Sequence, residues 1–308
     1  MNDSITSAIG NTPLVKLKKV TPPNCAEIYV KLEYYNPTGS YKDRMALAII
    51  ENAEKRGDLK PGIGVVECTG GSTGCSLAFV CAVKGYPFIV VSSDAFAKEK
   101  LKTMQLFGAK LELIPSDGGK ITPNLIPSMI ARTNEIGTQP NTYLTKQFEN
   151  KDAIDGYKVL GEEILQHFGS RKIDAFCGAV GTGGMMAGVS QALKAANAAN
   201  RVVILEPASA PLVTQGVKGT HKVEGIGVGF ISPLFNEIVY DEARTVDEAE
   251  ARQTVKRLAA EEGIFCGTSS GLNVAAAIKL GMELGPGHTV VTVACDSGMK
   301  YLNGDLFD

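Results

Sequence analysis

Short apolar runs rich in β-branched residues alternate along this chain with longer stretches of helical periodicity. Apolar strands separated by helices are typical of parallel sheets that helices cover on both faces, so the sequence predicts an α/β fold. The expected strands are VVEC near residue 65, FIVVSS at 88–93, LELI at 111–114, DAFCGAV at 174–180, VVILE at 202–206 and TVVTVAC at 289–295. The expected helices lie around 41–56, 74–84, 96–107, 152–168, 185–198, 247–262 and 270–284.

The chain is long enough for two lobes, since it has 308 residues, of which 44% are hydrophobic. A boundary near 145–150 fits the segment YLTKQFENKD, and no long linker separates the halves. A formal net charge of -2 provides no basic surface for nucleic acid. The first residues do not read as an export signal, and no apolar run approaches the roughly 18 residues of a membrane span.

The cysteines and histidines indicate neither a disulfide framework nor a metal site. An odd number of cysteines, with no C-x-x-C pair, is best explained by buried reduced thiols in a cytoplasmic protein. The three histidines, His167, His221 and His288, are far apart and lack ligand spacing, so no metal is expected. The seven cysteines are at positions 25, 68, 75, 81, 177, 266 and 295.

The sharpest candidate for an anion site is a glycine-rich turn, Gly181-Thr182-Gly183-Gly184, between a predicted strand and a predicted helix. Successive backbone N–H groups and the start of the helix suit a phosphate, although a tight connection without a ligand has the same pattern. A dinucleotide fingerprint would need glycine in place of Met186, and a P-loop would need a Gly-Lys-Ser/Thr ending. Glu206, at the end of the next strand, still leaves a nicotinamide-binding alternative open.

Two further turns place hydroxyl groups before helices. Residues 69–74, Thr-Gly-Gly-Ser-Thr-Gly, follow the strand near 65 and suit a carboxylate, because they supply several donors without a cation. Ser269 and Ser270 repeat the arrangement before the last helix. Either turn could be a simple helix cap.

Lys42 is expected at the start of a largely apolar helix, just after a Pro-Gly turn. The helix dipole disfavours a cation there, and a partly buried lysine amine is easily deprotonated. Such an amine is a nucleophile for a carbonyl, whereas the alternative is a solvated lysine.

Taken together, these segments resemble the cysteine synthase and cystathionine β-synthase family of fold-type II pyridoxal-phosphate enzymes. Any one segment could arise by chance, but seven in the order of the family could hardly do so. The matching segments are IGNTPLVKL at 9–17, NPTGSYKDR at 36–44, TGGSTG at 69–74, GTGG at 181–184, HKVEGIGVGF at 221–230, GTSSG at 267–271 and DSGMKYL at 296–302.

The resemblance implies a fold like that of the tryptophan synthase β-subunit, with two lobes that each hold a mainly parallel twisted sheet flanked by helices. The smaller, mobile lobe is expected at 42–147, and the larger lobe at 1–41 and 148–308. By the same resemblance, the cofactor is pyridoxal 5′-phosphate, which Lys42 carries as a Schiff base. The other implied cofactor-binding residues are Ser72, Gly181, Thr182, Gly183, Gly184 and Ser269, and the implied substrate-binding residues are Thr69, Gly70, Ser72, Thr73, Gln147 and Gly225.

Two departures from the family pattern bear on the substrate. Ser72 stands where the family has an asparagine that contacts the cofactor's 3′-hydroxyl, and Gly70 replaces a serine, so the carboxylate pocket loses a donor and gains room. Met185 replaces the threonine after GTGG and cannot donate to the phosphate. We therefore expect the phosphate site to depend on backbone N–H groups.

The chemistry implied is β-replacement on O-acetylserine, O-phosphoserine or serine through an aminoacrylate intermediate, with sulfide or another thiol as nucleophile and Lys42 as base. Ser269 is the implied partner of the pyridine nitrogen. A neutral hydroxyl leaves that nitrogen largely unprotonated, which favours loss of the β-group over transamination. The alternatives are a serine/threonine dehydratase and a catalytically silent cofactor-binding relative. The sequence identifies neither donor nor nucleophile, and the resemblance alone implies a homodimer.

Overall fold

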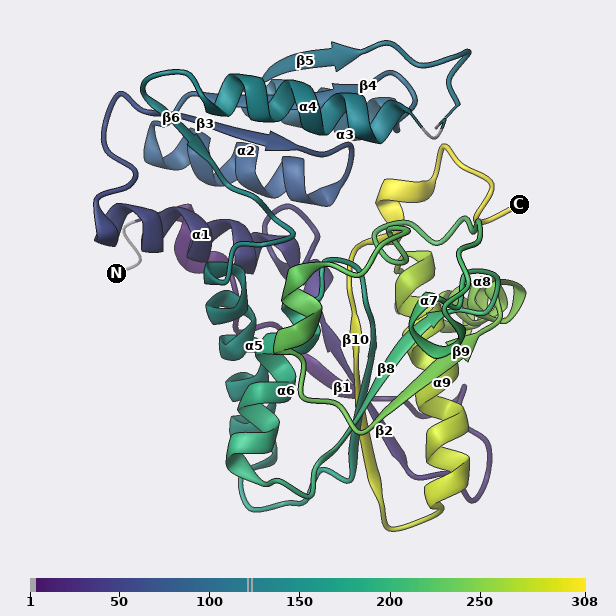
Figure 1. Cartoon of the computed structure of the whole chain (residues 1–308). Helices are drawn as coiled ribbons and strands as arrows, with labels where there is room; N and C mark the ends of the chain where they lie inside the picture. Colours follow the sequence, from purple (N-terminus) through teal and green to yellow (C-terminus); the bar gives the residue numbers. More distant parts are fainter. Residues whose placement is uncertain (1–3, 121, 123) are drawn as a thin grey trace. The chain divides into compact units, whose positions relative to one another are not determined.

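The chain forms two compact units, each with its own sheet, in a computed structural model that describes residues 4–120, 122 and 124–308 (Figure 1). The first unit comprises Met1–Ile9 and Lys42–Gly156, and the second comprises Gly10–Tyr41 and Tyr157–Asp308. The expected smaller lobe at 42–147 falls within the first unit, which also includes residues 148–156 and the described part of 1–9. The predicted α/β class is confirmed.

The first unit is built on a four-stranded parallel sheet in the order β5-β4-β3-β6. Neighbouring side chains of a strand point to opposite faces, so Val65 of β3 packs with Ile50 and Leu77, whereas Val66 packs with Leu125 and Met129. The strands are β3 (Gly64–Cys68), β4 (Phe88–Ser93), β5 (Lys110–Ile114) and β6 (Thr142–Leu144), and the helices are η1 (Ile5–Ala8), α1 (Lys42–Arg56), α2 (Ser72–Lys84), α3 (Lys98–Leu106) and α4 (Leu125–Gly137).

The second unit contains a six-stranded sheet in the order β1-β2-β10-β7-β8-β9, in which only the β1–β2 pair is antiparallel. In Figure 1, α5 and α6 lie on one side of β10 and β8, and α9 lies on the other. The strands are β1 (Leu14–Lys16), β2 (Glu27–Leu32), β7 (Ala175–Ala179), β8 (Arg201–Pro207), β9 (Glu242–Val246) and β10 (Thr289–Ala294). Helix α5 (Asp152–Phe168) begins in the first unit and continues into the second. The other helices of the second unit are η2 (Glu33–Tyr35), α6 (Gly184–Ala196), α7 (Leu212–Gln215), η3 (Pro233–Glu237), α8 (Glu248–Arg257), the π-helical η4 (Leu258–Glu262), α9 (Thr268–Leu284) and η5 (Gly298–Tyr301).

Every strand and helix expected from the pattern is present, with boundaries shifted by a few residues. The pattern missed two three-residue strands, β1 and β6, and also β2, β9, α4 and the one-turn helix α7. Three residues carry too little periodicity to separate a strand from a loop.

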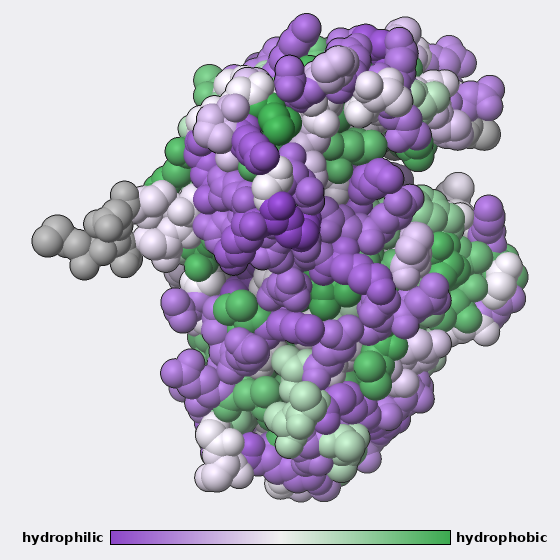
Figure 2. Space-filling view, turned by 60° about the vertical axis from the view of Figure 1, so that its left-hand side comes forward, coloured by the Kyte–Doolittle hydropathy of each residue, from purple (hydrophilic) through white to green (hydrophobic). Residues whose placement is uncertain are grey.

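The described helices include none that is both long and apolar enough to cross a membrane. On the face drawn in Figure 2, hydrophobic residues are dispersed among hydrophilic ones.

Candidate active site

The glycine-rich turn after β7 forms a tight cradle that only glycine can build. Gly183 has a left-handed backbone conformation (φ 89°), which side chains other than that of glycine rarely adopt. A Cβ atom on Gly181 would lie 2.1 Å from the carbonyl oxygen of Gly225, so the backbones of the two segments meet directly. The turn therefore depends on residues 225–235 as well as on its own glycines.

Backbone N–H groups at this turn are available for an anion. Gly183 is the N-cap of α6 and provides no side chain to it. In the described part of the chain, the N–H groups of Gly183, Gly184 and Met185 donate to no protein acceptor. Unsatisfied N–H groups at the positive end of a helix are the usual binding site of a phosphate, so the residues present fit the phosphate of pyridoxal 5′-phosphate.

Met185 takes no part in this cradle through its side chain. The side chain is 4% exposed, and its Cε lies 3.0 Å from the point where a Cβ on Gly178 of β7 would stand. It therefore packs toward the sheet. Position 185 therefore offers no side-chain donor at the turn, and the groups there that could meet an anion are the backbone N–H groups.

The segment that follows His221 closes around the turn. Gly227 N–H donates to the oxygen of Val180 at 3.1 Å, and Ser232 Oγ donates to the oxygen of Thr182 at 2.5 Å. Gly225 is exposed and has φ 83°. This conformation allows its carbonyl to approach Gly181.

Ser269 is the second residue of α9 and is 5% exposed. Its hydroxyl has no hydrogen-bond partner among the described residues. The helix that carries it is held in place, because Asn273 Oδ1 accepts from Ala179 N at 2.8 Å and Asn273 Nδ2 donates to the oxygen of Val293 at 2.9 Å. An unpartnered hydroxyl at the start of a fixed helix suits a ligand nitrogen, so this residue also fits the cofactor.

In the first unit, Lys42 is the first residue of α1 and is 6% exposed. The sequence placed it at a helix start, and the structure adds that its side chain is buried. Lys42 is therefore not the solvated lysine that the sequence left open as the alternative.

The loop at 69–73 is closed by Gln147. Thr73 Oγ1 donates to Gln147 Oε1 at 2.8 Å, and Gln147 Nε2 donates to the oxygen of Cys68 at 2.9 Å. Thr69 Oγ1 accepts from Gly71 N at 3.2 Å. Residues 74 positions apart in the sequence thus meet here, and both are buried. Ser72, which is half-buried, is the first residue of α2.

Two residues at this loop were not predicted from the sequence. The ring of Phe96 lies against Gly70, and the carboxyl of Glu67 is buried beneath the loop. An acidic residue in the otherwise apolar run VVEC was a signal for Glu67, whereas nothing in the sequence placed Phe96 beside Gly70.

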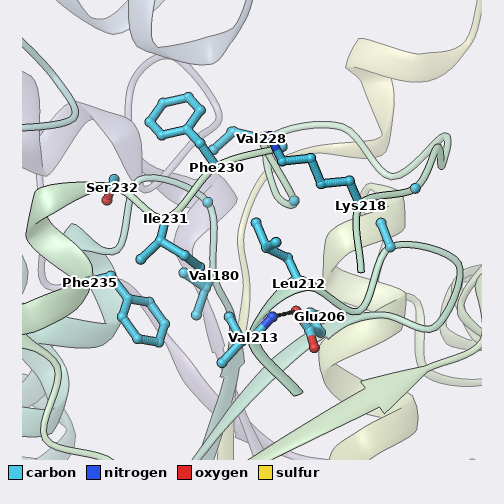
Figure 3. A pocket seen from close by; sticks show the side chains of 15 residues that line it. Val180, Glu206, Leu212, Val213, Lys218, Val228, Phe230, Ile231, Ser232 and Phe235 are labelled. Atoms are coloured by element: carbon cyan, nitrogen blue, oxygen red, sulfur yellow. Dashed lines mark hydrogen bonds between the residues drawn. The ribbon is translucent and has the colours of Figure 1, made fainter. Parts of the chain in front are cut away.

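A pocket in the second unit borders the cradle at Val180 and Gly181 and encloses about 480 Å³, part of it open to solvent. Figure 3 shows Leu212 and Ile231 near its middle and Lys218 at its rim. Glu206 also lines it, but its carboxylate accepts from Val213 N and Thr214 N, both at 2.8 Å, and from Thr214 Oγ1 at 2.6 Å (Figure 3). Because these groups occupy both oxygens, Glu206 caps α7, which weighs against the nicotinamide alternative.

The cysteines are free thiols, and no cluster of metal-ligating side chains occurs among the described residues. Burial raises the pKa of Cys68 and of Cys177 to about 12, which keeps both thiols neutral at physiological pH.

Comparisons with known proteins identify the family of the chain. The family model of the pyridoxal-phosphate dependent enzymes matches residues 5–296. The chain is 41% identical over 306 residues to a cysteine synthase of Staphylococcus aureus strain Mu50, covering 99% of this chain and 97% of the relative. It is 38% identical over 308 residues to the O-ureido-L-serine synthase of Streptomyces lavendulae, covering 99% of this chain and 93% of the relative.

The structure matches the crystal structure of O-acetylserine sulfhydrylase isoform 3 from Entamoeba histolytica with a TM-score of 0.93 at 35% identity, covering 100% of this chain and 92% of that one. The chain therefore belongs to the fold-type II pyridoxal-phosphate dependent enzymes of the cysteine synthase family.

Proposed function

We propose that this enzyme replaces the β-substituent of O-acetylserine, O-phosphoserine or serine, with sulfide as the preferred nucleophile and cysteine as the product. The observation that carries the proposal is the hydroxyl of Ser269, a residue that is 5% exposed and whose hydroxyl has no partner among the described residues. Ser269 would be a neutral partner for the pyridine nitrogen and would favour departure of the β-group of the substrate over transamination. The bound cofactor supplies an electron sink for the α-carbon of the amino acid.

The roles of the remaining residues follow from their chemistry. Lys42 Nζ would hold the cofactor in the resting enzyme and, once the incoming amino acid has released it, would take the α-proton of the substrate. Thr69, Gly70, Ser72 and Thr73 bind the substrate α-carboxylate through hydroxyl and backbone N–H groups, with Gln147 closing this loop. Gly181–Gly184 hold the phosphate, and Gly225 belongs to the segment at the mouth of the site.

Product analysis tests the reaction. The purified protein, loaded with pyridoxal phosphate, is incubated with each of the three donors, with and without sulfide. The proposal is supported if cysteine forms, and forms only when sulfide is present. If a 2-oxo acid and ammonia are released whether or not sulfide is present, the enzyme is a dehydratase. If cofactor is bound but no donor changes its absorbance or is consumed, the protein is a catalytically silent relative.

Lys42→Ala provides the matched control for the covalent link to the cofactor. Borohydride reduction followed by mass spectrometry should leave the cofactor attached to the wild-type protein at Lys42 and not to the variant. Attachment to the variant would refute the assignment of this lysine.

We further propose that the enzyme is a cytoplasmic homodimer and that the part containing 42–147 moves when substrate binds. Free thiols in a chain with seven cysteines suit a reducing compartment. Light scattering of the purified protein tests the dimer, and a monomer at micromolar concentration would contradict it.

A further inference from the structure

The carboxyl of Glu67 is a buried acidic group that the proposed reaction does not use. Glu67 is the second-last residue of β3 and is 3% exposed. Its Oε1 accepts from Cys68 N at 2.8 Å, and its Oε2 accepts from Gln147 N at 2.9 Å. None of the ion pairs among the described residues includes it, so nearby dipoles alone compensate any charge that it carries.

These bonds place Glu67 at the base of the loop at 69–73. Lys146 has a left-handed backbone (φ 51°), and Glu67 holds the residues on both sides of it, Thr145 and Gln147. Gln147 in turn spans the loop, from the oxygen of Cys68 to the hydroxyl of Thr73. The position of Gln147 is therefore set from beneath by Glu67.

The contacts of Thr145 indicate whether the carboxyl of Glu67 is protonated. Thr145 Oγ1 lies 2.6 Å from Glu67 Oε2 and 3.1 Å from the oxygen of Val66, yet a hydroxyl has one hydrogen. Both contacts become hydrogen bonds if Glu67 is protonated and donates to Thr145, which then donates to Val66. With an ionised Glu67 the Thr145 hydroxyl donates to the carboxylate, and the Val66 oxygen retains only its bond from Thr145 N at 3.2 Å.

Burial of Glu67 also favours its neutral form. Loss of hydration raises the pKa of Glu67, and the hydrogen bonds that the ionised carboxylate would accept from Thr145, Gln147 and Cys68 oppose this rise only in part.

Few other titratable groups face this carboxyl. Among the described residues, only the thiol of Cys68 interacts with Glu67 electrostatically, and that thiol stays neutral because its pKa is about 12. The neighbouring Lys146 is exposed, and its Nζ lies 3.6 Å from Glu149 Oε2. Of the elements packed against β3, β4 carries no titratable side chain, whereas the other three carry Tyr143 (β6), Arg132 and Glu135 (α4), and Cys75, Cys81 and Lys84 (α2).

We propose that Glu67 is a neutral carboxylic acid in the resting enzyme, and that it is a positioning residue whose loss of a proton weakens binding of the substrate α-carboxylate. The proposal rests on the assignment of the loop at 69–73 to that carboxylate. Two negative charges on either side of one loop repel each other, and the ionised carboxylate accepts from Thr145 instead of donating to it. In the neutral form Oε2 donates to Thr145 and keeps a lone pair for Gln147 N, so Gln147 is held without this repulsion.

The protonation state can be measured without substrate. Protein with ¹³C-carboxyl glutamate is examined by infrared and carbon NMR spectroscopy at pH 7, with and without cofactor. We expect a protonated carboxyl signal in the wild-type protein that is missing from Glu67→Gln, whose amide also donates to Thr145. Glu54→Gln, which removes a carboxyl bonded to Lys84 and Tyr86, is the matched control and should retain the signal. Absence of the signal from the wild-type protein at pH 7 overturns the proposal.

The coupling to substrate is measured from the change in cofactor absorbance on adding O-acetylserine or serine between pH 6 and 9.5. Wild-type affinity should fall on the order of tenfold or more across the range in which the carboxyl signal disappears, since tenfold corresponds to one pKa unit of coupling. Glu67→Gln should not show this fall, and an identical pH profile in both proteins overturns the proposal. Should Glu67→Gln not fold, Glu67→Met, which is also uncharged and of similar length, replaces it in both measurements.

Failure of this inference and failure of the proposed function give different results. If no serine derivative changes the cofactor spectrum, the function is wrong, while the carboxyl signal still decides the state of Glu67.

Discussion

Gly70 lies directly beneath an aromatic ring, so adding one methyl group there tests how rigidly the substrate loop is held. A Cβ on Gly70 would stand 2.0 Å from Phe96 Cγ and 2.3 Å from each Cδ, far inside contact distance. The ring cannot move freely, because it packs on a cluster that includes Val66, Val91 and Met129. Gly70→Ala must therefore displace the ring or the loop.

The expected magnitude follows from two opposing effects. Overpacking a core site costs about 1–3 kcal/mol, whereas replacing glycine by alanine stabilises by about 0.4–1 kcal/mol through the unfolded chain. Gly70→Ala should thus lower the free energy of unfolding by about 1–2 kcal/mol. The adjacent Gly71 has extended backbone (φ -125°), and a methyl group added to it would have no atom within 4 Å, so Gly71→Ala should be neutral or slightly stabilising.

Urea unfolding followed by circular dichroism gives these free energies in a chain that has no tryptophan. Combining Gly70→Ala with Phe96→Ala removes the clash, so the double variant should be more stable than the sum of the single effects by about 1 kcal/mol or more. Equal stabilities for Gly70→Ala and Gly71→Ala, or strict additivity in the double variant, would refute the close approach of Phe96.

Three more outcomes follow from other contacts. Asn273→Ala should cost about 2–4 kcal/mol in urea unfolding, because it leaves the buried Ala179 N–H and Val293 oxygen without their partner, and a loss below about 0.5 kcal/mol contradicts this. Burial raises the pKa of Glu67 in the folded state, so the wild-type protein should lose stability as pH rises from the unfolded value of about 4.3, by up to about 1.4 kcal/mol per pH unit until the folded pKa is passed. The stability gap between Glu67→Gln and wild type should widen with pH over that window, and a constant gap speaks against a raised pKa. Gly181→Ala, whose Cβ would meet the Gly225 oxygen at 2.1 Å, should lose cofactor on dialysis that the wild-type protein keeps, and equal retention would show that the cradle tolerates a side chain.

Local sequence patterns were sufficient for the fold class and for much of the candidate site. Strands such as FIVVSS at 88–93 and helices such as 152–168 lie where their sequences predict them, because apolar runs and helical periods mark the segments that face the core. The glycine turn at 181–184 and the helix start at Lys42 were likewise visible, since backbone conformation and helix capping depend on neighbouring residues.

Contacts between distant segments needed the tertiary structure. Gly225 meets Gly181 and Phe96 covers Gly70, and no local pattern encodes which of many loops will meet. Gln147 joins Thr73, a grouping that the family resemblance had implied but that no local pattern showed. The burial of Glu67 is of the same kind. The sequence shows an acidic residue in the strand VVEC. The surroundings of its side chain, and with them the raised pKa, depend on Thr145 and Gln147, which lie about 80 residues later in the chain. Hydration and hydrogen bonding of a side chain are properties of the folded surroundings, so only the tertiary structure determined them.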